Sequence, residues 1–237
     1  MNDFQEIDDT ERKKELARQT KLSELKCSKN IWDYIDLYQR WNLNFFPVSS
    51  KENDRTPLVA WKELQHRKAT KEEIEYWYKN RFQGANISIV CGSISDNFVA
   101  VDIDDGLYIE RFKRAMPNAP IIKTAKGVHF WLKTFKPVKT ISLQDENGEE
   151  LISIRGEGAS CTAPPSIHYT DRNTHYTFVN LPADIPMFLG DLIEVSCKIT
   201  GLEKKRVHTG KPYGLWKRVS FEEVINLIHS KFGEKNE

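Results

Sequence analysis

The sequence has no long hydrophobic run. No stretch approaches the roughly 20 consecutive apolar residues that a membrane-spanning helix requires, and residues 1–9 are polar and acidic, unlike a secretory signal peptide. We therefore expect a cytoplasmic protein without a membrane partner.

Closely spaced cysteines are also absent. None of the cysteines forms a Cys-x-x-Cys pair, so a disulfide framework and a structural zinc site are both disfavoured. We predict free, buried thiols in a reducing cytosol. The cysteines are Cys27, Cys91, Cys161 and Cys197.

The sequence contains neither a Gly-x-Gly-x-x-Gly motif nor a P-loop. It also lacks the regular alternation of strands and helices that builds a doubly wound parallel sheet. These absences argue against a dinucleotide-binding fold and against an ATPase site within this chain.

Enough apolar material is present for a core. The 237 residues are 39% hydrophobic and 29% charged, with 6 Trp, 12 Phe and 8 Tyr. These values are typical of a soluble globular protein. The length allows one sizeable domain with extensions, or two small domains.

The charges nearly cancel, with 35 basic and 34 acidic residues and a formal net charge of +1. Global charge therefore does not indicate a nucleic-acid-binding protein. Residues 198–218, however, carry many bases and one acid, Glu203. This strip, which includes Lys204, Lys205 and Arg206, would follow a phosphate backbone or form a solvated linker.

Composition and periodicity divide the chain into three parts. Residues 1–30 are interpreted as a charged N-terminal helical arm, with a helix over about 9–26. Residues 31–190 form the core. Residues 191–237 form a basic linker and a C-terminal helix near 221–232.

Within the core, the pattern predicts an α/β (α+β) fold whose strands lie mostly in hairpins. Thr70 and Glu73 form a capping box that starts a helix. The strands at 86–92 and 98–104 are expected to pair as a hairpin. The other expected elements are helices at 31–42 and 107–115 and strands at 44–48, 121–124, 128–132, 151–155 and 174–179.

Residues 99–104, with the sequence VAVDID, carry the strongest chemical signal. Side chains alternate along a strand, so Asp102 and Asp104 share one face. Carboxylate oxygens are hard ligands that suit Mg²⁺ or Mn²⁺. An exposed pair of acids at a strand end is the structural alternative.

Two later strands supply groups able to bind phosphate. His129 begins an apolar strand after Gly127, a residue that permits close backbone approach to a ligand. Its ring can donate a hydrogen bond to a phosphate oxygen. Arg155, on one strand face with Ser153, can form a forked contact with a triphosphate. A satisfied strand histidine and a surface arginine are the alternatives.

A Pro-Pro pair before Ser166 indicates first a rigid corner of the chain. A nucleotide contact by Ser166 or His168 is a second interpretation. Tyr169 and Tyr176 are able to stack on bases, but we expect both to pack in the core.

Eight short segments follow one another along the chain: WNLNFFP at 41–47, RTP at 55–57 with Trp61, the helix at 70–77, NISIVCG at 86–92, VDID at 101–104, TAKGVH at 124–129, IRGEG at 154–158 and APPSIH at 163–168. In this order they resemble the bifunctional DNA primase/polymerase (prim-pol) N-terminal family, of the archaeo-eukaryotic primase superfamily. The likeness runs from about Ile31 to Val179.

The resemblance implies an archaeo-eukaryotic primase-type catalytic core with an RRM-like sheet and flanking helices. Asp102 and Asp104 would bind Mg²⁺ or Mn²⁺, and His129 would contact the triphosphate of the incoming nucleotide. The partners would be a single-stranded DNA template, nucleoside triphosphates and, as in many family members, a helicase module in the same or a separate chain. The further nucleotide-binding residues would be Arg155, Lys126, Arg55, Ser166 and His168.

Ser153 departs from the family, which usually has a third carboxylate at this position. A hydroxyl cannot replace the charge of a carboxylate on a hard cation. Three interpretations remain open: Glu150 or Glu157 substitutes from nearby, the site works with weakened metal binding, or the protein has lost catalysis and kept nucleotide or DNA binding.

We therefore expect a primase-polymerase core that catalyses template-dependent, divalent-metal-dependent nucleotidyl transfer. The reaction would serve primer synthesis or DNA extension in the replication of a plasmid, virus or integrated element. The alternatives are a non-catalytic replication-initiation module that binds nucleotide or DNA, and a metal-dependent nuclease that uses the same carboxylates.

Overall fold

The structure is a computed structural model that describes residues 20, 22–26 and 28–201, together with the backbone of 207–209. Residues 22–26 are helical, and most of the helix expected at 9–26 lies outside the described residues. So do the expected C-terminal helix and the basic residues Lys204, Lys205 and Arg206.

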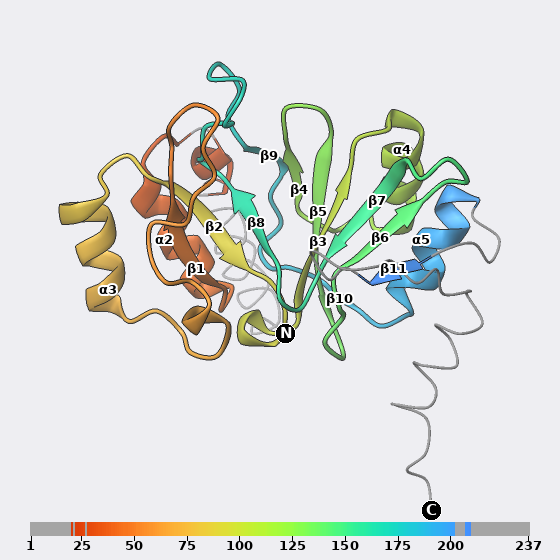
Figure 1. Cartoon of the computed structure of the whole chain (residues 1–237), viewed down its shortest axis with the longest axis horizontal. Coiled ribbons are helices and arrows are strands. Elements are labelled where there is room, and N and C mark those ends of the chain that lie inside the picture. Colours follow the sequence, from red (N-terminus) through yellow and green to blue (C-terminus); the bar gives the residue numbers. More distant parts are fainter. Residues whose placement is uncertain (1–19, 21, 27, 202–206, 210–237) are drawn as a thin grey trace, which may run out of the picture.

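Two sheets organise the fold (Figure 1). The smaller has the strand order β1-β2-β8, and the larger has the order β11-β6-β7-β3-β5-β4-β9, with β10 beside β5. All pairs are antiparallel except β10 with β5. The strands are β1 Asn44–Val48, β2 Asn86–Val90, β3 Phe98–Ile103, β4 Ile121–Lys123, β5 Val128–Thr134, β6 Ile141–Gln144, β7 Glu150–Arg155, β8 Ser160–Ala163, β9 Thr177–Asn180, β10 Met187–Phe188 and β11 Val207–Thr209.

Helices flank both sheets. In Figure 1, α2 and α3 lie beside the small sheet, and α4 and α5 lie beside the large one. This arrangement is the α+β primase-type architecture that the resemblance implied. The helical segments are α2 Ile31–Arg40, η1 Glu63–Gln65, α3 Lys71–Glu75, the π-helical η2 Tyr76–Arg81, η3 Ser93–Ser95, α4 Gly106–Ala115 and α5 Leu192–Thr200.

The two faces of β3 belong to two different cores. Val99, Val101 and Ile103 pack with α4 and α5. Phe98 and Ala100 pack with α2 and the small sheet. Because side chains alternate along a strand, Asp102 lies on the face of Phe98 and Ala100. The carboxylate therefore points to the side of the large sheet on which the small sheet lies.

Local signals for the helices are confirmed. The side chain of Thr70 accepts from the backbone N–H of Glu73, and the carboxylate of Glu73 accepts from the backbone N–H of Thr70, which completes the capping box. Asn30 caps α2 through the backbone N–H of Trp32. These caps satisfy helix N–H groups that would otherwise lack partners.

The expected hairpin of residues 86–92 and 98–104 is wrong. β2 lies between β1 and β8, whereas β3 lies between β5 and β7. Gly92, with φ of 95°, and the short helix η3 redirect the chain between them, so that only the bridge Gly92–Phe98 joins the two segments. The positive φ at Gly92 is one that glycine adopts without a steric penalty.

The first residues of the expected C-terminal linker, which begins at residue 191, form a helix instead. Residues 192–200 form α5, whose N-terminus is capped by Asp191. Leu192, Ile193 and Cys197 are buried in the core beneath the large sheet. This segment is therefore part of the folded core rather than a solvated linker.

Candidate functional site

Asp102 lies in the middle of the large sheet, near the end of β3. The strand register places His129 of β5 directly opposite it on one side and Ser153 of β7 directly opposite it on the other. Directly opposed residues in neighbouring strands project from the same face of a sheet. The fold thus gathers three residues that are up to 51 positions apart in the sequence.

The carboxylate of Asp102 has two cationic or potentially cationic neighbours. Nη2 of Arg155 donates to Oδ2 at 2.8 Å, and Nε2 of His129 lies 3.5 Å from Oδ1. Burial by itself would raise the pKa of Asp102, yet His129 and Arg155 together lower it to about 2. Asp102 is therefore an anion at neutral pH.

Asp104 follows the last residue of β3 and is exposed. The next residue, Asp105, has a different task, because its side chain accepts from the backbone N–H of Leu107 and caps α4. The run of acids thus divides into two residues that face the site and one that starts a helix.

Gly127 fixes the distance between the loop before β5 and the end of β3. A Cβ atom at Gly127 would lie 2.0 Å from the carbonyl oxygen of Ile103 and 2.8 Å from Oδ1 of Asp104. The sequence had suggested that this glycine lets the backbone approach a ligand. In the structure, the close approach is to the end of β3, at Ile103 and Asp104.

A pocket of about 360 Å³ opens over these residues. It brings together most of the side chains that the sequence had marked, including Asp102 of β3, Asp104 just after that strand, and bases from three separate segments. The lining residues with polar or aromatic side chains are Arg55, Asp102, Asp104, Thr124, Lys126, His129, Arg155, Thr162, His168, Tyr169, Thr170 and Tyr176.

Ser166 does not line this pocket. It is buried, and its hydroxyl accepts from the backbone N–H of Ile87 at 2.9 Å and donates to the carbonyl oxygen of Ile87 at 3.2 Å. The hydroxyl therefore anchors the Pro-Pro loop to β2. This observation corresponds to the rigid-corner interpretation and gives Ser166 no contact with the pocket.

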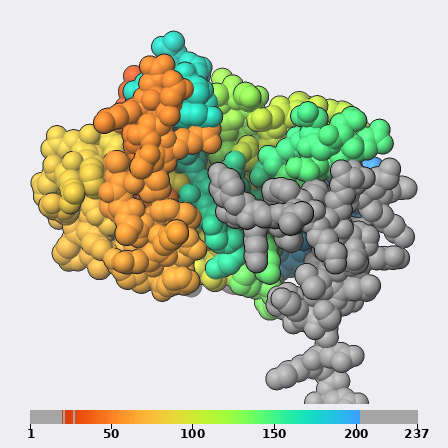
Figure 2. Space-filling model, in the orientation of Figure 1, coloured from red at the N-terminus to blue at the C-terminus, as the bar shows by residue number. Residues whose placement is uncertain are grey.

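Arg55 and Tyr169 form one wall of the pocket. The guanidinium group of Arg55 lies 3.4 Å from the centre of the Tyr169 ring, a cation–π arrangement that orients the arginine. The backbone N–H of Asn53 also donates to the carbonyl oxygen of Tyr169 at 2.8 Å. In Figure 2 the orange surface near residues 50–60 borders the teal surface near residues 160–175. Tyr169, which we expected in the core, is half-buried and lines the site.

His168 stands beside this wall. Its Nδ1 atom accepts from the backbone N–H of Asp171 at 3.2 Å. Burial and then the positive charge of Arg55 lower the pKa of His168. The ring is therefore neutral at neutral pH and, with Nδ1 already an acceptor, Nε2 carries the proton as a hydrogen-bond donor.

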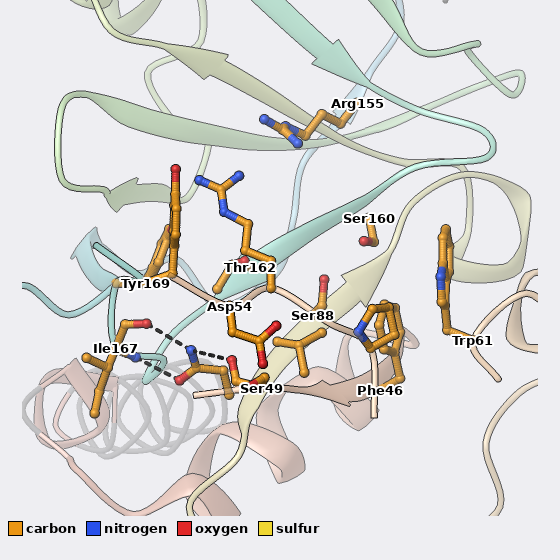
Figure 3. Close-up of a pocket in the computed structure, with 15 residues that line it drawn as sticks. Phe46, Ser49, Asp54, Trp61, Ser88, Arg155, Ser160, Thr162, Ile167 and Tyr169 are labelled. Atoms are coloured by element: carbon orange, nitrogen blue, oxygen red, sulfur yellow. Dashed lines mark hydrogen bonds between the residues drawn. The ribbon is translucent and has the colours of Figure 1, made fainter. Parts of the chain in front are cut away.

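A second pocket of about 170 Å³ adjoins the first (Figure 3). The two pockets share the lining residues Arg55, Arg155, Thr162, Tyr169 and Tyr176. In Figure 3, Tyr169 and Trp61 lie at opposite ends, with Thr162 and Ser88 between them. Phe46 stacks on Trp61 with ring centres 5.2 Å apart.

Three of the hydroxyl side chains that line this second pocket, Ser88, Ser160 and Thr162, were not identified from the sequence. Ser88 of β2 pairs directly with Thr162 of β8, so both side chains project from one face of the small sheet. The alternation of polar Ser160 and Thr162 with buried Cys161 and Ala163 was the available signal, but a four-residue strand is too short to be distinguished from a loop.

The two glutamates near Ser153, Glu150 and Glu157, do not take the place of a carboxylate at position 153. Glu150 accepts a hydrogen bond from the hydroxyl of Ser142. Glu157 accepts from the backbone N–H of Ser93 at 2.8 Å and from its hydroxyl at 3.0 Å. Neither glutamate lines the pocket that contains Asp102.

Within the described residues, no group of three or more His, Cys, Asp or Glu side chains is arranged to hold a metal ion. Asp102 and Asp104 nevertheless supply hard carboxylate oxygens to one pocket. The donor set fits a divalent cation that takes its remaining ligands from water or from the oxygens of a bound phosphate.

Comparison with known proteins adds to this geometry. In the part of the chain that the structure describes, no helix is long and apolar enough to cross a membrane. No curated protein matches the chain. The family model described as bifunctional DNA primase/polymerase, N-terminal, matches residues 35–188, more than half of the chain and including Asp102, Asp104, His129 and Arg155. The chain therefore belongs to the bifunctional DNA primase/polymerase family, whose general activity is nucleotidyl transfer with nucleotide and DNA substrates.

Proposed function

We propose that this chain is a primase-polymerase core that catalyses template-dependent, divalent-metal-dependent nucleotidyl transfer in the replication of a plasmid, virus or integrated element. The supporting observation is the convergence of Asp102 and Asp104 with Arg55, Lys126 and Arg155 in one pocket. Carboxylates for a cation and bases for phosphates are the two kinds of group that this chemistry needs.

In the proposed reaction, a 3′-hydroxyl or an initiating nucleotide attacks the α-phosphate of an incoming nucleoside triphosphate. A new phosphodiester bond forms at that phosphorus, the hydroxyl proton passes to solvent water, and pyrophosphate leaves as the bond between the α-phosphorus and the oxygen bridging to the β-phosphate breaks. Mg²⁺ or Mn²⁺ held by Asp102 and Asp104 would neutralise phosphate charge and activate the attacking hydroxyl.

The residues of the chain would hold the nucleotide for this reaction. Arg155, Lys126 and Arg55 all line the pocket. Arg155 contacts Asp102, and Arg55 lies over the ring of Tyr169. His129 has a buried Nδ1 atom without a hydrogen-bond partner among the described residues, and an unpaired buried polar atom is costly. A phosphate oxygen would give the imidazole a partner once the ring turns.

The adjoining pocket suits the nucleoside part of the substrate. Trp61, which stacks on the buried Phe46, provides flat apolar surface, and Ser88 and Thr162 provide hydroxyl groups. Aromatic faces bind bases of any sequence by stacking. Since this pocket is continuous with the charged one, a triphosphate and its nucleoside would occupy neighbouring parts of one cleft.

The alternative function is a non-catalytic module that binds nucleotide or DNA. The observation that favours it is Ser153, which stands directly opposite Asp102 where the family usually has a carboxylate. This alternative predicts nucleotide binding without incorporation.

The test is incorporation of labelled nucleotides on a single-stranded template, with and without a primer, in Mg²⁺ or Mn²⁺. The wild-type chain is compared with the double variant Asp102→Asn, Asp104→Asn. The matched control is Glu146→Gln, Glu149→Gln, which removes the same charge from an exposed turn outside the pocket. Incorporation by the wild type and the control, but not by the double Asp variant, supports the proposal. No incorporation by the wild type supports the binding module, and cleavage of DNA without nucleotides would indicate a nuclease.

A further inference from the structure

Arg155 occupies a carboxylate oxygen that a metal ion would need. Its Nη2 atom lies 2.8 Å from Oδ2 of Asp102, and the two side chains are only 34% and 21% exposed. A hydrogen-bonded ion pair that is mostly removed from water is held far more firmly than a surface pair. Without a bound ligand, a cation approaching Asp102 therefore competes with a guanidinium group of the protein itself.

The strand register shows why Arg155 is favoured over a cation in the competition for Asp102. Ser153 lies directly opposite Asp102 on β7, two residues before Arg155 on the same strand face. A carboxylate at position 153 would be a second anion for both a metal ion and Arg155. With a serine there, and with Glu150 and Glu157 bonded to Ser142 and Ser93, Asp102 is the carboxylate that Arg155 contacts in this pocket.

The net charge of the pocket also disfavours the binding of a cation without nucleotide. Its lining contains three permanent cations and two carboxylates, so the surplus is positive before any contribution from the histidines. Such a pocket attracts a polyphosphate more strongly than it attracts a free divalent cation. The charged lining residues are Arg55, Lys126, Arg155, Asp102 and Asp104.

We propose that Arg155 is a built-in counter-ion of Asp102, so that the pocket binds a nucleoside triphosphate first and its divalent cation only with that nucleotide. The inference rests on the nucleotide site proposed above. The phosphates draw the guanidinium group away from Oδ2 and supply oxygen ligands at the same time. The nucleotide and the cation then raise each other's affinity by the same factor, as thermodynamic linkage requires.

The experiment measures binding to the full chain and does not depend on turnover. Mn²⁺ is titrated and followed by electron paramagnetic resonance, with and without a non-hydrolysable nucleoside triphosphate. Calorimetry measures the binding of the same nucleotide in EDTA. We expect the nucleotide to bind in EDTA, and we expect it to tighten Mn²⁺ binding by roughly tenfold or more.

Two variants of matched size isolate the charge at position 153. Ser153→Asp should tighten the binding of Mn²⁺ without nucleotide by roughly tenfold or more, because it adds an anion beside Asp102. Ser153→Asn should leave Mn²⁺ binding near the wild-type value. Arg155→Gln should tighten Mn²⁺ binding and weaken nucleotide binding in EDTA, with circular dichroism confirming that the variant is folded.

Tight binding of Mn²⁺ to the wild-type chain alone, unchanged by nucleotide, would overturn the inference. So would a nucleotide that binds only when Mn²⁺ is present, or equal effects of Ser153→Asp and Ser153→Asn. If nucleotide binds in EDTA and tightens Mn²⁺ binding, yet no incorporation occurs, the binding order stands and the proposed catalysis fails. A nucleotide that binds under no condition refutes both.

Discussion

Replacement of Asp102 by Asn tests the electrostatics of the site through the stability of the fold. Asn keeps the size of the side chain but removes the charge that Arg155 and His129 contact. The pKa of Asp102 falls from its usual 3.8 to about 2 on folding. A difference of this size corresponds to roughly 2 kcal/mol of unfolding free energy at neutral pH.

The sign of the pH dependence follows from the direction of this shift. Because folding lowers the pKa of the carboxyl, the stabilisation is fully present above the unfolded pKa and is lost as pH falls through the folded pKa. We therefore expect the free energy of unfolding of Asp102→Asn to be about 2 kcal/mol lower than that of the wild type at neutral pH. The difference should shrink to roughly 1 kcal/mol near pH 3.

Urea denaturation of both chains at several pH values measures this difference. Asp36→Asn, a substitution at an exposed position on α2, controls for the change in net charge. If Asp102→Asn unfolds with the wild-type free energy at neutral pH, or if the difference does not change between pH 7 and about 3, the ion-pair argument fails.

Three further substitutions address the loops and caps around the site. Gly127→Ala should destabilise the fold by about 1–3 kcal/mol in urea denaturation, because its Cβ would lie 2.0 Å from the carbonyl oxygen of Ile103; wild-type stability would contradict this close approach. Thr70→Ala should lose about 1 kcal/mol through its missing cap, whereas Thr70→Ser should lose little. Tyr169→Ala should weaken nucleotide binding roughly tenfold in calorimetry, because it releases Arg55. Tyr169→Phe keeps the ring and should bind nucleotide like the wild type. An equal loss of affinity in both variants would assign the effect to the hydroxyl.

The sequence predicted those parts of the fold that depend on neighbouring residues. The capping box at Thr70 and the shared face of Asp102 and Asp104 both follow from spacing along the chain. The strand expected at 98–104 was recognised for the same reason, because alternation and β-branched residues act locally, and β3 ends one residue earlier, at Ile103.

Strand pairing could not be predicted in the same way. β3 pairs with β5 and β7, which come later in the chain, rather than with its neighbour β2. A turn signal between two strands does not say whether they join one sheet, and here the backbone at Gly92 sends the second strand to a different sheet. β6 and β8 were missed because each has only four residues and lacks the consecutive β-branched residues that marked the still shorter β4.

In the candidate site, too, residue types could be predicted from the sequence, but the position of each side chain depends on the fold. Asp102, His129 and Arg155 were chosen from the sequence by residue type, and the fold brings them together. The hydroxyl of Ser166 binds the backbone of Ile87 instead, because the loop that follows β8 places Ser166 against β2. Tyr169 lines the pocket through its contact with Arg55, a loop residue more than one hundred positions earlier.

The most direct single measurement is the rate of labelled-nucleotide incorporation on a primed single-stranded template in Mn²⁺. Nucleotidyl transfer at the Asp102–Asp104 pocket predicts incorporation by the wild type that falls by about a hundredfold or more in Asp102→Asn, Asp104→Asn, with the Glu146→Gln, Glu149→Gln control unaffected. Incorporation that survives the double Asp substitution would place the chemistry elsewhere, and a wild-type chain that binds nucleotide but incorporates none would show that the site only binds.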